Sequence, residues 1–184
     1  YGGIDVFNFD RPASAADNTD IGSLKGLLVA RGDHTANYTD LNKSAEEYNK
    51  TINTSAIMTV QAQFDQLIHG IVTAINDILC PNKTITNASG KSITILDKDK
   101  APAGMDENQT QGETLFCRKY VVTYREPTEE EMVEFGLTKD DLVYNEEDPN
   151  DPYSLFTLGQ IEVNKNIKSN YSLIPLSSNN GTGD

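Results

Sequence analysis

The chain has 184 residues, of which 28 are acidic and 15 are basic, and its formal net charge is −13 at pH 7. This length suffices for one ordinary domain, or for a core with a small insert. The acidic balance, with basic residues scattered, argues against nucleic acid and anionic membranes as partners, because both require a basic face. No apolar run is long enough to span a bilayer, and no signal peptide is recognisable. The first residue is Tyr1 rather than Met, and we expect a fragment of a longer protein.

The N-terminal region is predicted to hold a strand, a linker and a first helix. Residues 4–9 alternate apolar and polar side chains, which is typical of a half-buried strand. A helix is expected over residues 21–31 after the N-cap candidate Asp20, and Gly32 supplies the left-handed residue that ends it. The predicted inner face of this helix consists of Ile21, Leu24, Leu27 and Leu28.

A long amphipathic helix is predicted over residues 55–79. Apolar residues recur there at alternating steps of three and four, which places them on one stripe of a helix about 37 Å long. We expect this stripe to be a buried packing seam, made of Ile57, Val60, Phe64, Leu67, Ile71, Ala74 and Ile78. Three further apolar residues widen it on one side: Ile68, Ile75 and Leu79. A short amphipathic helix upstream is expected to pack on the long one through Leu41, Ala45 and Tyr48.

The residues after the long helix have the pattern of strands. Alternation of apolar and polar residues predicts strands over residues 91–96 and 114–125, joined by a mobile loop. A capping box formed by Thr128 and Glu131 predicts a helix over residues 128–137. These elements indicate a small β-containing subdomain.

Together the elements predict an α+β fold. Its main part is a predominantly helical, elongated core with one long amphipathic helix, and a small antiparallel β-containing insert is added to it. The helical core is expected to comprise residues 17–80 and 155–184, with the acidic insert at 81–154 and the N-terminal strand and linker at 1–16. An insert whose ends lie close together is a tolerated way to add a surface module.

The sequence offers no recognisable catalytic or metal site. His34 and His69 lack further ligands at metal spacing. The segment from Asp97 begins like a calcium loop, but Pro102 stands where the loop requires glycine. Cys117 has no activating histidine placed by a motif, and no phosphate-binding, dinucleotide or zinc-protease motif occurs. We therefore expect a protein that is not an enzyme and that holds no cofactor or metal.

Two further features bear on export. Cys80 and Cys117 could form a disulfide outside the cell, although two lone cysteines are more often buried thiols. Asn-x-Ser/Thr sequences would be glycan acceptors in a eukaryotic secreted protein, but in an Asn- and Thr-rich chain they also follow from composition. They occur at Asn37, Asn42, Asn49, Asn53, Asn82, Asn87, Asn108, Asn170 and Asn180.

Two blocks of the sequence resemble a known family. Residues 22–33 read G-S-L-K-G-L-L-V-A-R-G-D, and residues 63–76 read Q-F-D-Q-L-I-H-G-I-V-T-A-I-N. Together they resemble the hook-associated proteins of the bacterial flagellar hook–filament junction. In that family a G-x-L-x-G-L-L-x-x-R-D block leads into a helix with L-D-x-L-A-x-x-L-x-x-x-x-N. The matching residues are Gly22, Leu24, Gly26, Leu27, Leu28, Arg31, Asp33, Asp65, Leu67 and Asn76.

The C-terminal region adds to the resemblance, and other parts depart from it. Residues 161–164 and 171–174 look like the family's strand, V-N-P and P-S-L-I-A-A-S segment. Residues 180–184 look like the G-D-x-x-N turn that precedes the family's last helices. Gly32 is inserted in the first block, and residues 81–155 match nothing in the family. The resemblance thus covers the middle segment of such a protein.

The resemblance implies a structural component of the flagellum that is needed for its assembly and for motility. Its expected partners are other copies in an axial ring, the flagellar hook protein and a second junction protein. The expected location is extracellular, reached by the flagellar type III route without a cleaved signal peptide. Because the family's terminal helices drive assembly and this segment lacks them, we expect the isolated fragment to be a monomer.

A second interpretation stays open. The chain could be a secreted surface module that recognises glycan or a host protein through the β-containing insert. A groove lined by Phe116, Tyr120 and Tyr124 would favour this interpretation, although alternating aromatic residues in strands usually belong to a core.

Overall fold

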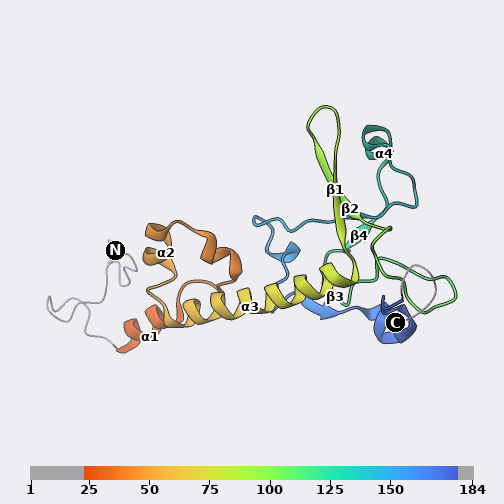
Figure 1. Ribbon diagram of the computed structural model, residues 1–184. Helices are drawn as coiled ribbons and strands as arrows, with labels where there is room; N and C mark the ends of the chain where they lie inside the picture. The colour runs from red at the N-terminus through yellow and green to blue at the C-terminus, as the bar shows by residue number, and fades with distance from the viewer. Residues whose placement is uncertain (1–22, 178–184) are drawn as a thin grey trace, which may run out of the picture. The chain divides into compact units, whose positions relative to one another are not determined.

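The computed structural model describes residues 23–177 (Figure 1). Its contacts divide the chain into two compact units, one up to Ile68 and one from His69 onward. The division falls within helix α3 (Ala56–Leu79), so this helix contributes residues to both units. The sequence placed its domain boundaries elsewhere, after residue 80 and before residue 155. The predicted strand at 4–9, the N-cap Asp20 and the turn at 180–184 lie outside the described residues.

The first unit consists of short helices and the first half of α3. Helix α1 (Ser23–Arg31) is followed by a 3-10 helix (Tyr38–Asn42) and by α2 (Ala45–Thr51). The sequence predicted α1 and the short amphipathic helix before α3. Leu27 of α1 is exposed, however, so its predicted position on an inner face is wrong.

A small apolar cluster holds the first unit together. Its buried members are Ala36, Ile52, Met58 and Ala62. Leu41 and Tyr48 pack against this cluster, as the sequence predicted. Gly32 lies beside it with φ +80°, a conformation that disfavours other residues, and a Cβ there would be only 1.9 Å from the Met58 sulfur. The glycine inserted after Arg31 therefore lets the chain turn closely past α3.

The second unit contains two small antiparallel sheets. The larger sheet has the strand order β1-β2-β5-β4. Its strands are β1 (Asn82–Thr86), β2 (Ser92–Leu96), β4 (Tyr124–Arg125) and β5 (Val143–Tyr144). The smaller sheet pairs β3 (Phe116–Arg118) with β6 (Ile161–Val163), and Phe116 lies opposite Val163. The remaining elements are a 3-10 helix (Pro152–Ser154), α5 (Lys165–Ser169) and a last 3-10 helix (Tyr171–Leu173).

Strand β2 separates two apolar clusters, because successive side chains of a strand point to opposite faces. Leu96 belongs to a cluster with Cys80 and Ala101. Ile95 belongs to the other, together with Leu137 and Val143. Helix α4 (Glu129–Phe135) covers this second cluster with Met132 and Phe135, and Figure 1 shows α4 near the β1–β2 hairpin.

The prediction of a helix at 128–137 is confirmed. Thr128 Oγ1 accepts a hydrogen bond from Glu131 N, and the Glu131 carboxylate accepts one from Thr128 N, which together form the capping box. Gly136 ends the helix with φ +68°. The strand predicted at 91–96 is also present, as β2, and β6 lies where residues 161–164 resemble the family's strand segment.

The prediction of a predominantly helical, elongated core with one long helix is wrong. The described residues contain five α-helices and an antiparallel sheet, with 40% of residues helical and 14% in strands. In the region from residue 155, expected to return to a helical core, β6 pairs with β3 and is followed, up to residue 177, by only two short helices, α5 and a 3-10 helix. The single strand expected over 114–125 is two strands, β3 and β4, in different sheets, because the segment between them bends.

Candidate functional site

Helix α3 has two faces of opposite character. Its buried face consists of Met58, Ala62, Asp65, Val72 and Asn76. The residues predicted as a seam lie on the opposite side of the helix, as their spacing requires, and all seven are exposed in the single chain. Val60 is 64% exposed, Phe64 51% and Ile78 73%. We call this surface the apolar face of α3; it consists of Ile57, Val60, Phe64, Leu67, Ile71, Ala74 and Ile78.

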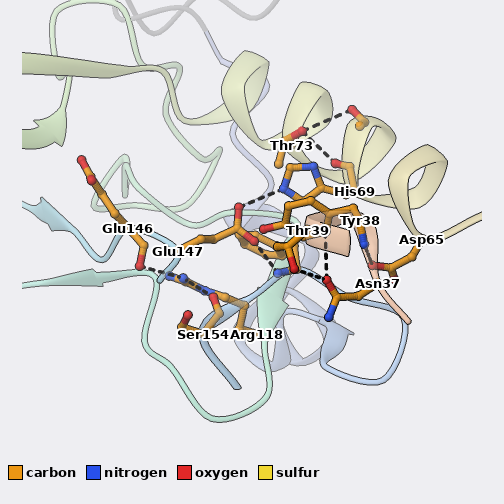
Figure 2. Close-up of polar contacts among 12 residues, drawn as sticks. Asn37, Tyr38, Thr39, Asp65, His69, Thr73, Arg118, Glu146, Glu147 and Ser154 are labelled. Carbon is orange, nitrogen blue, oxygen red and sulfur yellow. Dashed lines mark hydrogen bonds and ion pairs between the residues drawn. The ribbon is translucent and has the colours of Figure 1, made fainter. Parts of the chain in front are cut away.

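Asp65, a residue of the family-like motif, anchors the buried face in the first unit. Its side chain is 2% exposed, and its Oδ2 accepts a hydrogen bond from Tyr38 N at 3.0 Å (Figure 2). One turn earlier, Gln61 Oε1 accepts a bond from Ala36 N at 3.3 Å. Polar side chains of α3 thus satisfy backbone donors of the preceding segment, which a purely apolar face would leave unpaired.

Asn76, also a motif residue, performs the same task in the second unit. Its Nδ2 donates to the Phe116 carbonyl at 2.9 Å, and Phe116 N donates to its Oδ1 at 3.1 Å. This pair of bonds fixes α3 against the start of β3. Asp65 and Asn76 therefore hold the helix from one side, whereas Leu67, the motif residue between them, lies on the apolar face and is 57% exposed.

His69 is paired with a carboxylate from the segment after β5. Its Nε2 lies 2.9 Å from Glu147 Oε2, and both side chains are largely buried (Figure 2). The other carboxylate oxygen of Glu147 accepts a bond from Phe156 N at 2.5 Å. The pair connects the second half of α3 to the segment after β5.

Arg118 is a buried cation that sequence reasoning did not single out. The residue is 2% exposed, and its guanidinium donates to the carbonyls of Ser154 at 2.7 Å and Asn145 at 2.5 Å. The same group lies 5.0 Å from the ring centre of Phe156 and 5.9 Å from that of Tyr144. Carbonyl oxygens and ring faces together accommodate this buried charge.

The other candidates from the sequence have structural partners. His34 contacts the carboxylates of Asp33 at 2.7 Å and Asp40 at 3.2 Å. Burial acts to raise the pKa of Asp40, but hydrogen bonds from Lys43, Asn37 N and His34 hold that pKa below its ordinary value. Within residues 23–177, no group of three or more His, Cys, Asp or Glu side chains is arranged to hold a metal ion.

The two cysteines are free thiols in different environments. Cys80 is buried beside Leu96 and Ala101, and this burial raises the pKa of its thiol to about 12. Cys117 is partly exposed, and its sulfur lies 3.5 Å from the Thr114 hydroxyl.

A groove of about 560 Å³ opens on the second unit near β3 and β6. Tyr120 and Tyr124, two of the three aromatic residues expected to line a binding groove, do line it, whereas Phe116 does not. Tyr120 is 70% exposed, so it is not the core residue that alternation favoured.

Comparisons with known proteins give no relative of this chain. No protein-family model, no curated protein and no solved structure matches it. Among the described helices, none combines the length and the apolar character that crossing a bilayer requires.

Proposed function

We propose that the chain is the middle segment of a hook-associated protein at the hook–filament junction of a bacterial flagellum, and that its role is structural. The observation that carries this proposal is the apolar face of α3, on which seven apolar side chains at heptad spacing are exposed. A monomeric protein rarely exposes a contiguous apolar surface of this kind unless a partner covers it. The family-like blocks support further helical segments of the same axial assembly as that partner.

The polar anchors on the other side of α3 support the same role. Asp65 anchors the first part of α3 within the first unit and Asn76 anchors its last part within the second, so the apolar face lies on a helix rather than on a loop. The motif residues then divide into two kinds, with Asp65 and Asn76 positioning the helix and Leu67 making the assembly contact.

Immunogold labelling of native cells with an antibody against this chain tests the location. A single band of label where the hook meets the filament is expected. Label spread over the cell wall or along the whole filament would overturn the junction proposal and favour a surface-binding or filament protein.

Introducing a charge in the full-length protein tests the apolar face itself. Leu67→Glu is expected to abolish the junction band and motility, because a carboxylate in a heptad contact cannot be buried without a partner. Gln66→Glu, an exposed neighbour outside the apolar face, is the matched control and is expected to assemble normally. Both purified variants should unfold at the temperature of the unmodified protein, because both side chains are exposed in the single chain. Normal assembly of the Leu67→Glu variant would contradict the proposed role of this face.

A further inference from the structure

The groove on the second unit has features of a binding site that the proposed function does not use. It lies between residues 111–114, residues 119–124 and the junction of β6 with α5. Its volume of about 560 Å³ falls in the range of small-molecule sites. Its lining includes the side chains of Glu113, Cys117, Tyr120, Thr123, Glu162 and Lys165.

The wall of the groove is held rigidly. Glu113 accepts hydrogen bonds from the side-chain amides of Asn164 at 2.6 Å and Asn166 at 3.0 Å, so its carboxylate is fixed in one orientation. Gly112 has φ +84°, and a Cβ at this position would lie 2.7 Å from a methyl group of Leu142. A fixed acceptor on a closely packed wall is the kind of preorganised group that ligand sites require.

The charges of the groove favour an uncharged ligand. Its charged lining residues are two carboxylates, Glu113 and Glu162, and three cations, Lys119, Lys165 and Arg118. Arg118 is buried, and its guanidinium already donates to the carbonyls of Ser154 and Asn145. Lys165 is paired with Glu162 at 3.0 Å, and Lys119 donates to the Gly159 carbonyl at 2.8 Å. A phosphate or nucleotide would have to displace these bonds and approach two carboxylates. The many polar groups equally disfavour a purely apolar ligand.

An aromatic ring completes the site. Tyr120 is 70% exposed, and Tyr153 packs edge-on against it with the ring centres 5.6 Å apart and the ring planes at 88°. This contact orients the Tyr120 ring and leaves an aromatic face available for the C–H surface of a ligand. The buried hydroxyl of Thr123, another groove residue, has no hydrogen-bond partner among the described residues.

We propose that this groove binds a neutral saccharide of one or two sugar units, with Tyr120 stacking on a sugar ring and Glu113 accepting from its hydroxyl groups. A saccharide is uncharged, offers both donors and acceptors, and presents an apolar C–H face, which matches each feature of the groove. The proposal stands on the second unit alone and does not depend on the role of α3.

Cys117 provides a reporter for the test, because it lines the groove and is partly exposed, whereas Cys80 is 1% exposed. The native chain is alkylated with iodoacetamide in the presence of cellobiose, maltose or N,N′-diacetylchitobiose at millimolar concentration. Mass spectrometry measures the rate at which Cys117 is alkylated. At least one disaccharide is expected to slow the alkylation of Cys117 several-fold and to give saturation-transfer NMR signals.

Variants separate binding at this groove from other effects. Tyr120→Ala is expected to abolish both the protection and the NMR signals. Tyr171→Ala, which removes an equally exposed tyrosine outside the groove, should change neither. The proposal is overturned if none of the three disaccharides protects Cys117, if protection survives in Tyr120→Ala, or if inorganic phosphate protects equally well and so identifies an anion site.

Discussion

At the scale of single residues, buried charges and carboxylates explain how short, separate segments are held in place. Arg118 joins β3 to the segments around Asn145 and Ser154 through their carbonyls. Asp65 and Asn76 satisfy backbone groups from distant parts of their own units. Because the apolar clusters within residues 23–177 each contain only three or four buried residues, such polar anchors have a large share in specifying the fold.

Arg118→Met is expected to destabilise the second unit by about 3–5 kcal/mol, because methionine leaves the buried Ser154 carbonyl and the part-buried Asn145 carbonyl without the guanidinium donor. Urea-induced unfolding followed by circular dichroism measures the change. Lys139→Met, an exposed residue of the same unit, should alter the free energy of unfolding by less than about 0.5 kcal/mol. A loss below about 1 kcal/mol for Arg118→Met would show that the buried guanidinium contributes little.

The pair of Arg125 and Glu131 predicts a pH dependence. Arg125 donates to both carboxylate oxygens of Glu131, at 2.6 and 2.7 Å, and these bonds are the main reason that the Glu131 pKa is lowered to about 2. Because the folded-state pKa lies below the unfolded value, the pair stabilises the protein fully above about pH 5. That contribution is lost as the pH falls towards 2.

The free energy of unfolding is expected to fall by about 1–2 kcal/mol between pH 5 and 2. This is less than the full pKa shift would give, because water screens a partly exposed pair. Thermal unfolding between pH 5 and 2 measures it, and Glu131→Gln should unfold with a weaker dependence on pH over this interval. Glu129→Gln makes the same charge change in the same turn without a bond to Arg125 and is the matched control. An unchanged slope in Glu131→Gln would refute the assignment.

At the scale of elements, two glycines near or within helices have opposite roles. Gly70 lies in the middle of α3, and an added Cβ would meet nothing within 4 Å. Gly70→Ala is therefore expected to raise the stability of the isolated chain by about 0.5–1 kcal/mol through helix propensity. Gly32→Ala should lower it by about 1–3 kcal/mol, because its φ is positive and Met58 occupies the space. Differential scanning calorimetry compares the two, and a stabilising Gly32→Ala or a destabilising Gly70→Ala would contradict this account.

The sequence predicted elements whose signals are local. The capping box at Thr128, the left-handed Gly32 and the period of α3 each follow from neighbours within a few residues. The sequence did not predict which side of α3 would be buried. Apolar periodicity pointed to the face with Phe64 and Ile71, whereas the chain buries the side with Asp65 and Asn76, whose partners come from other segments.

Strand pairing was harder to predict because it depends on distant partners. Strand β3 is defined by β6, which lies more than forty residues further along the chain, and β4 has only two residues. Strand β1 follows directly after Pro81 and was not predicted at all. The sequence named two of the groove's aromatic residues, Tyr120 and Tyr124, but not the rest of its lining, because three separate segments form it.

At the scale of the whole molecule, the distribution of apolar residues predicts that covering the apolar face of α3 would raise the stability of the chain. Most large side chains of α3 that could build a core are exposed instead. Each of them would contribute on the order of 1.5–3 kcal/mol if a partner buried it fully. A protein with clusters this small is expected to be marginally stable in isolation, and to unfold at a higher temperature once the apolar face is covered.

The alternating spacing of the apolar face also determines the direction that a partner element must follow along α3. Its residues repeat every 3.5 positions, whereas an α-helix turns once in 3.6, so the stripe drifts by about 20° in each heptad. Between Ile57 and Ile78, three heptads apart, the direction of the face rotates by about 60°. A straight neighbour would lose contact before the end of α3. A neighbour that keeps contact along the whole stripe must wind around the helix with a left-handed twist.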